Sequence, residues 1–318
     1  MSYPYSRIDL GPIEQMHALR RLFGPEGSYS NEAIAAVSRL VTAQRVAAGT
    51  QLARQGEPFG NLFLVIDGLL ELTYHGVSLG VFSNGTGVGA LSSLAQDQLG
   101  FACSALEDST LLVLRTGDLL ELFEDHFELM HGALIRLAAD AIAWRRALTP
   151  TAGFSNQVRP QCHACGTREL GLVERMLCLR ETIGLEHSYI DELAELARAA
   201  TEVRYDSDIA LWSTGDVATY SMIVISGEVA GRSPEGAEFR FGPGDLLGNL
   251  DTIAGVPRWY DARVQGEVIA LTLDSEAIVD VWEDHPALGF AFLRMLSRLI
   301  LSLRVKAADM QLPVAALP

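Results

Sequence analysis

Hydrophobic and polar positions follow two periods along the chain, and their order occurs twice. Residues 13–23, 31–41 and 118–148 carry apolar side chains at steps of three and four, which predicts helices with one buried face. Residues 62–76 and 110–116 are short apolar runs broken by glycine, which is typical of strands joined by tight turns. The second occurrence comprises predicted helices at 172–183, 190–200 and 276–305 and predicted strands at 221–232 and 268–274.

A shift of 159 residues superposes the two halves without a gap. The triplet Glu124-Asp125-His126 then falls on Glu283-Asp284-His285. Glycines coincide as well, as expected where a turn needs a positive φ. The matching pairs are Gly56 and Gly215, Gly68 and Gly227, Gly85 and Gly244, and Gly89 and Gly248. Upstream, residues 10–20 pair with residues 170–180 at a shift of 160.

The repeat predicts two copies of one domain, at residues 8–148 and 168–308, joined by a linker at 149–167. Short strands at this spacing indicate a jelly roll. We therefore predict a mainly β, α+β chain of two tandem β-rolls, each flanked by helices. A length of 318 residues suits two domains.

Charge and composition narrow the function classes. The formal net charge of −16 opposes binding to a nucleic-acid backbone, so we expect no DNA partner. The N-terminus lacks a secretion pattern, and arginines interrupt the apolar stretch 288–305, so we expect a cytoplasmic protein with no membrane contact. Four cysteines at irregular spacing do not form the disulfide framework of a secreted domain.

The order of helices, short strands and a long last helix resembles the cyclic nucleotide-binding domain, the β-roll of bacterial catabolite activators and of regulatory subunits of cyclic-AMP-dependent kinase. The first copy carries the resemblance in LARQGEPFGNLFLVIDGLLEL and ALEDSTLLVLRTGDLLELFEDH. The second carries it in LWSTGDVATYSMIVISGEV and LTLDSEAIVDVWEDHPAL. Relatives that regulate transcription have a helix-turn-helix after the long helix, and the residues after 305 show no such pattern.

The resemblance implies a phosphate-binding cassette, G-E-x-A-L-L-x-x-x-P-R-x-A-[TS]. In that cassette the glutamate binds the ribose 2′-OH and the arginine pairs with the cyclic phosphate. The first copy, from Gly89, has Ala90, Leu99 and Phe101 at the glutamate, arginine and small-residue positions. We therefore expect the first copy to be structural.

The second copy keeps half of the cassette. From Gly248 it reads GNLDTIAGVPRWYDARV, with Asn249 for the glutamate, Arg258 for the arginine, and Trp259 and Tyr260 for small residues. On this resemblance, Arg258 would pair with the phosphate of a cyclic nucleotide or related anion. Asn249 would touch a sugar hydroxyl, and an aromatic ring would stack on the ligand. Gly248 and its neighbours, among them Leu250, would offer backbone N–H groups.

The same residues permit a second interpretation. Arg258 would form an ion pair within the domain, with Asp251 or Asp261, in a pocket closed by Trp259 and Tyr260. Both alternatives stay open from the sequence.

The linker contains Cys162-His163-Ala164-Cys165. Such a pair of thiols suits a metal or a reversible disulfide, and two chains together would supply four ligands. The alternative is an unliganded pair. Cys178 and Cys103 are expected in the core.

The histidines suggest no catalytic or metal site. His126 and His285 are expected where a helix turns, and His75 is assigned to a strand. With no nucleophile and base in a recognisable arrangement, we expect no enzyme.

The last helix carries apolar residues on most sides, including Leu296, Ile300 and Leu303. We expect part of it to pack on its own roll and the rest to pair with a second chain in a homodimer. Packing against the first copy is the alternative. The leading functional hypothesis is a regulatory or adaptor protein with a protein partner, whose second copy senses an anion. A ligand-free scaffold and a metal- or redox-responsive dimer are the alternatives.

Overall fold

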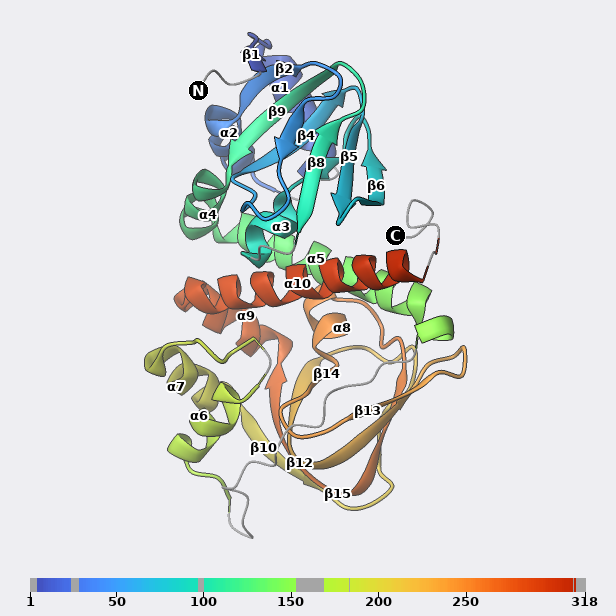
Figure 1. Cartoon of the computed structure of the whole chain (residues 1–318). Coiled ribbons are helices and arrows are strands. Elements are labelled where there is room, and N and C mark those ends of the chain that lie inside the picture. The colour runs from blue at the N-terminus through green and yellow to red at the C-terminus, as the bar shows by residue number, and fades with distance from the viewer. Residues whose placement is uncertain are drawn as a thin grey trace. The chain divides into compact units, whose positions relative to one another are not determined.

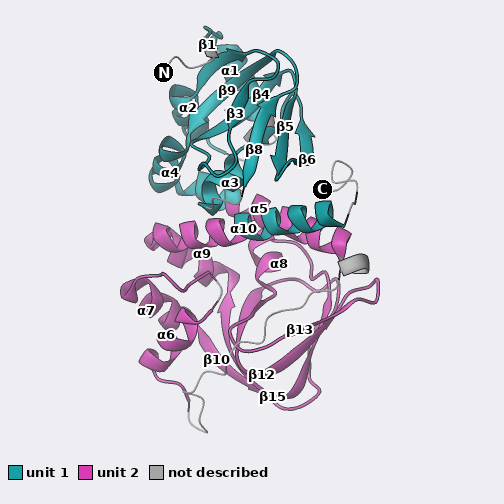
Figure 2. Ribbon diagram, in the orientation of Figure 1, with its two compact units in different colours: residues 1–133, 297–318 teal, residues 134–296 magenta. Residues whose placement is uncertain are grey.

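The computed structural model describes residues 5–23, 29–96, 100–152, 169–182, 184–310 and 312. These residues form two compact units, which Figure 2 distinguishes by colour. The first contains Met1–Ala133 and Ser297–Pro318, and the second contains Leu134–Leu296. Each unit holds one β-roll.

The first roll begins with α1 (Pro12–Phe23) and α2 (Asn31–Leu40) and ends with α4 (Thr116–Asp125). Its strands are β1 (Tyr5–Arg7), β2 (Thr42–Val46), β3 (Gln51–Ala53), β4 (Asn61–Asp67), β5 (Leu70–Tyr74), β6 (Val77–Phe82), β7 (Gly87–Val88), β8 (Phe101–Ala105) and β9 (Ser109–Arg115). They form two antiparallel sheets, ordered β1-β2-β9-β4-β7 and β3-β8-β5-β6. Figure 1 shows β9 and β4 of the first sheet and β8, β5 and β6 of the second. Apolar side chains from both sheets, such as Phe63, Leu72 and Leu111, form one buried core. The predicted jelly roll is therefore confirmed.

The second roll repeats this plan. α6 (Leu172–Arg180) and α7 (Ile190–Ala199) precede it, and α9 (Ser275–Asp284) follows it. Its strands are β10 (Thr201–Tyr205), β11 (Ala210–Trp212), β12 (Tyr220–Arg232), β13 (Glu238–Phe241), β14 (Leu246–Leu247) and β15 (Asp261–Asp274). The long strands β12 and β15 cover the positions of β4–β5 and β8–β9, and their pairing is bulged next to Gly227.

The repeated glycines occupy equivalent turns. All four pairs have positive φ, for example 82° at both Gly85 and Gly244. Gly68 and Gly227 also lie against backbone, because a Cβ would come within 2.7 Å of Ser109 Cα in one copy and 2.2 Å of the Glu267 oxygen in the other. The coincidence of glycines in the sequence therefore reflects one set of turns used twice.

A long helix follows each repeat, and each helix belongs to both compact units. α5 (Phe127–Ala152) enters the second unit at Leu134, and α10 (Pro286–Asp309) enters the first unit at Ser297. Leu301 of α10 lies in the core of the first roll, with Val305 and Ala308 packed beside it. The C-terminal part of the last helix therefore packs on the first copy, the alternative to packing on a second chain. The compact units also cut across the sequence repeats at 8–148 and 168–308.

Several local predictions are confirmed. Cys103 and Cys178 are buried. His126 and His285 end α4 and α9 with non-helical backbone, so the helix turns at both. The assignment of His75 to a strand is wrong, because this residue has a φ of 46° and lies in the turn after β5, where its Nδ1 is 2.6 Å from Gln55 Nε2.

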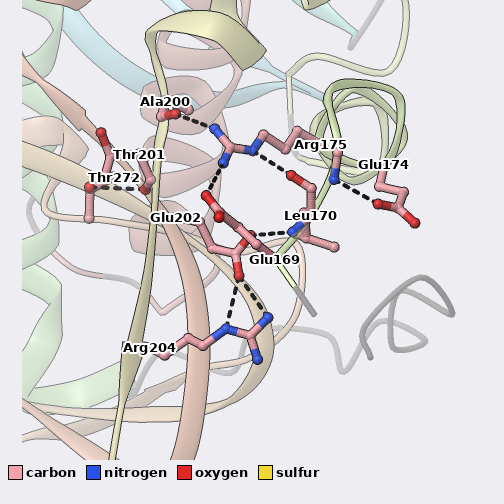
Figure 3. Close-up of polar contacts among 10 residues, drawn as sticks. Glu169, Leu170, Glu174, Arg175, Ala200, Thr201, Glu202, Arg204 and Thr272 are labelled. Carbon is pink, nitrogen blue, oxygen red and sulfur yellow. Dashed lines mark hydrogen bonds and ion pairs between the residues drawn. The ribbon is translucent and has the colours of Figure 1, made fainter. Parts of the chain in front are cut away.

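A set of polar contacts anchors α6 to the start of the second roll (Figure 3). Arg175 donates to the carbonyl oxygens of Leu170 at 3.1 Å and Ala200 at 2.8 Å. The buried carboxylate of Glu202 on β10 accepts from Leu170 N at 2.6 Å and from Arg204 Nε at 2.9 Å. These contacts satisfy backbone groups at the N-terminal end of the second repeat.

Within the described residues, α10 is the helix long and apolar enough to span a membrane by length and composition. Half of the most apolar stretch of this helix is buried in the protein. A core helix of a water-soluble protein has the same composition.

Candidate ligand site in the second roll

The cassette of the second copy is a short helix between two strands. β14 ends at Gly248, whose φ of 68° starts α8 (Asn249–Ala254), and the chain then returns through Arg258 to β15. A Cβ on Gly248 would lie 2.3 Å from Arg258 Nη1. The guanidinium of Arg258 can therefore take this position only because residue 248 is glycine, since any side chain there would displace it.

Arg258 is buried, with 2% of its surface exposed. Its Nη1 donates to the Gly248 carbonyl at 2.8 Å and lies 3.4 Å from Thr252 Oγ1. Its Nη2 donates to the Tyr220 carbonyl. The guanidinium carbon also lies 4.2 Å from the centre of the Trp212 ring, a cation–π distance. The guanidinium thus has partners within its own domain.

Asp251 provides the opposite charge. Its Oδ2 lies 3.5 Å from Arg258 Nη1, and both side chains are 1% exposed. Burial raises the pKa of Asp251 to about 7, although Arg258 and Arg145 oppose the shift. Neither carboxyl oxygen has a hydrogen-bond partner among the described residues. The pair is therefore held by charge rather than by bidentate hydrogen bonds.

A second arginine acts on this site from α5. The charge of Arg145 interacts with Tyr260, Asp251 and Asp245, and burial lowers its pKa. Arg145 lies outside the cassette motif, so the sequence alone did not predict its place at this site.

Aromatic rings fill the roll beside the arginine. Trp259 stacks on Phe239 at 5.5 Å, and Tyr260 stacks on Phe241 at 5.7 Å between ring centres. The Tyr260 hydroxyl accepts from Gly248 N at 3.0 Å, so this backbone donor is already used. Burial raises the pKa of Tyr260. Trp259 and Tyr260 are 6% and 2% exposed, which places them in the core.

The structure therefore brings the predicted site residues together in a closed arrangement. Gly248, Asn249, Leu250, Arg258, Trp259 and Tyr260 are all buried. Of the two acids considered as partners, Asp251 is the one beside Arg258. Asp261 instead accepts from Thr214 N at 2.6 Å. Trp212 and Tyr220 were not predicted from the sequence, because they lie on other strands and contact Arg258 only after folding.

The cassette of the first copy carries different groups. α3 (Ala90–Ala95) starts at Gly89, and Ser93 Oγ donates to the Phe59 carbonyl at 3.0 Å. Phe101 belongs to the apolar core, and Leu99 lies outside the described residues. Ser92 stands where the second copy has Asp251. The structural role expected of the first copy stays a prediction.

The linker cysteines Cys162 and Cys165 lie outside the described residues, so their metal or redox role stays a prediction. No cluster of three metal-ligating side chains occurs in the described part of the chain.

Comparison with known families identifies the fold. The sequence model of the cyclic nucleotide-binding domain matches residues 43–126 and again residues 202–285. The two matches are 159 residues apart and together cover more than half of the chain. The chain belongs to the cyclic nucleotide-binding domain family and contains two such domains in tandem.

Two kinds of curated relative share part of the sequence. A CRP-like cAMP-activated global transcriptional regulator of Mycobacterium tuberculosis is 29% identical over 132 residues, which are 40% of this chain and 58% of that protein. An uncharacterized NTE family protein of the same species is 29% identical over 111 residues, 35% of this chain and 19% of that protein. The chain thus matches less than two thirds of either relative.

Solved structures resemble the chain more broadly. The regulatory subunit of a cAMP-independent protein kinase A from Trypanosoma brucei is 14% identical, with a TM-score of 0.33, over 98% of this chain and 95% of that one. The N-terminal domain of a transcriptional regulator from Streptomyces coelicolor is 25% identical, with a TM-score of 0.35, over 42% of this chain and 95% of that domain.

Proposed function

We propose that this protein is a non-enzymatic regulatory or adaptor protein of the cytoplasm. Its two cyclic nucleotide-binding-like domains act on a protein partner without binding a nucleotide. The observation that carries the proposal is the set of partners around Arg258. The guanidinium that would receive a phosphate is occupied by two carbonyl groups, Asp251 and an aromatic face.

The filling of both rolls supports the same role. Trp259 and Tyr260 take up space in the second roll, and an apolar core that includes Leu301 of α10 takes it up in the first. The mycobacterial regulator is described as cAMP-activated, and the trypanosome subunit as cAMP-independent. The net charge of −16 favours a protein partner over DNA.

Thermal unfolding of the full chain tests the proposal. Cyclic AMP, cyclic GMP and cyclic dinucleotides are added in turn at millimolar concentration. A ligand present at about 100 times its Kd would add about 2.7 kcal/mol of stability and raise the midpoint visibly. We expect no shift. A shift that Arg258→Ala abolishes would contradict the proposal and restore the sensor hypothesis.

Light scattering after gel filtration tests the oligomeric state. The homodimer expected from the last helix remains a proposal, since part of the apolar surface of that helix is used within the first unit.

A further inference from the structure

Asp251 has an environment that ordinary packing does not explain. Its side chain is fully buried, and neither carboxyl oxygen has a hydrogen-bond partner among the described residues. Buried carboxyl groups are normally hydrogen-bonded, because an unpaired one loses its hydration without compensation. The group at hand to offset that loss is Arg258, 3.5 Å away. The role of Asp251 is therefore tied to the charge of the arginine.

The two repeats show that the acid and the arginine occur together. The second copy has both Asp251 and Arg258, and the first copy has Ser92 and Leu99 at the equivalent positions. Both copies otherwise keep the same turn and short helix, from Gly89 and from Gly248. The fold therefore does not need an acid at this position. The acid accompanies the positive charge.

The chemistry of the pair is that of an oxyanion on a guanidinium. A carboxylate presents two coplanar oxygens, and arginine pairs with carboxylates and phosphates through the same donors. Nη1 of Arg258 faces Asp251 Oδ2 while also donating to the Gly248 carbonyl. The charge of Arg145 on α5 reinforces the positive field at the carboxylate.

We propose that the carboxylate of Asp251 is a built-in oxyanion that occupies the anion position beside Arg258 and excludes small external oxyanions from it. The inference rests on the proposed ligand-independent function and states what keeps the second roll closed. Removal of the carboxylate leaves a space beside an uncompensated guanidinium. A small oxyanion such as formate or inorganic phosphate binds there.

The experiment measures thermal unfolding of the full chain carrying Asp251→Ala at pH 8. Formate and phosphate are titrated to tens of millimolar against chloride at equal ionic strength. We expect the variant to unfold at a lower temperature than wild type. Added formate or phosphate should raise its unfolding temperature part of the way back, and the rise should saturate with oxyanion concentration. Wild type shows no oxyanion-specific shift. Asp251→Ser, which carries the serine of the first copy, responds in the same direction.

Two controls make the result specific. The double variant Asp251→Ala/Arg258→Ala lacks the cation and should not respond. Asp118→Ala removes a carboxylate from a different ion pair, with Arg115 at 2.7 Å in the first roll, and should also show no oxyanion-specific shift. If both single variants at position 251 fail to fold, refolding with formate present becomes the readout.

The proposal is overturned if the variants respond to oxyanions no more than to chloride, or if wild type responds equally. Failure of refolding with formate would overturn it too. Nucleotide binding by wild type is a separate outcome, because it would contradict the proposed function and not the response of the variants.

Discussion

Arg298 lies on the helix that follows the second repeat, and its Nε donates to the carbonyl oxygen of Ala95 in the first repeat, at 3.0 Å. Ala95 ends α3, the short helix of the first cassette. Three residues further along α10, Leu301 enters the core of the first roll. The C-terminal part of α10 is therefore a structural element of the first unit.

Leu301→Ala tests this role. The residue is 1% exposed, so its truncation should leave a cavity and cost about 2–5 kcal/mol of unfolding free energy. The loss should appear in the first unit although the residue follows the second repeat. Denaturant unfolding followed by amide hydrogen exchange would locate it. Ser302→Ala, at the next and exposed position, should change the free energy by less than about 0.5 kcal/mol. Equal effects of the two variants would contradict the assignment.

Gly227→Ala and Gly215→Ala separate steric conflict from backbone strain. Both residues have positive φ, 88° and 95°. A Cβ on Gly227 would come 2.2 Å from the Glu267 oxygen, while one on Gly215 would meet nothing within 4 Å. We expect Gly215→Ala to cost about 1–2 kcal/mol from left-handed backbone alone, and Gly227→Ala to cost clearly more. Thermal or urea unfolding measures both, and a larger cost at Gly215 would refute the explanation.

Asp251→Asn tests the proton linkage of the buried pair. The folded protein raises the pKa of this carboxyl from 3.8 to about 7, so it binds the proton more tightly than the unfolded chain does. The contribution of Asp251 to stability is therefore greatest below pH 4, falls as the pH rises to about 7, and is flat above it. The asparagine variant should lack this slope, because an amide does not titrate in this pH range.

Urea unfolding at several pH values measures the difference between wild type and Asp251→Asn. Each unit by which folding changes the pKa alters the unfolding free energy by at most about 1.4 kcal/mol across the titration. A difference between the two proteins that does not change with pH would show that folding leaves the pKa of Asp251 unchanged, and would contradict this prediction. Asp261→Asn would not test the same linkage. The pKa of the exposed Asp261 carboxyl is lowered by the hydrogen bond from Thr214 N, whereas the pKa of Asp251 is raised by burial.

Arg175→Ala tests the anchor of α6. The side chain is 16% exposed and donates to two backbone carbonyl groups. Both carbonyl groups lose this donor in the alanine variant. We expect a loss of about 1–3 kcal/mol, measured by chemical denaturation. Arg198→Ala on α7 removes an arginine that is 55% exposed and paired with Glu195, and it should cost about 0.5 kcal/mol or less. Similar losses for the two variants would show that the carbonyl contacts add little.

Much of the fold was accessible from local patterns. Apolar steps of three and four predicted α2 and α7, and the glycine pairs predicted turns that all have positive φ. These features depend on neighbours in sequence, since helix faces and left-handed turns are set within a few residues. The cassette was found through the resemblance to the family, whose motif falls on one continuous segment around α8.

The state of the cassette was not accessible in the same way. From the sequence, the candidate partners of Arg258 were Asp251, Asp261 or a ligand. The observed partners also include Tyr220 and Trp212, which lie on other strands. Arg145, whose charge acts on Asp251, is more than 100 residues away from Asp251 along the chain. Spacing along the chain carries no information about such contacts.

The sequence by itself determined that this protein is a duplicated β-roll, because repeated turns and periodic apolar faces are local properties. Its resemblance to the family then identified one lost and one half-kept cassette. Only the tertiary structure decided that Arg258 of the half-kept cassette lies buried beside Asp251, Tyr220 and Trp212, and that Leu301 of the last helix packs in the core of the first roll. Both depend on which distant side chains meet when the apolar surface is buried. Burial then fixes the outcome, because a guanidinium removed from water must find its partners inside the protein.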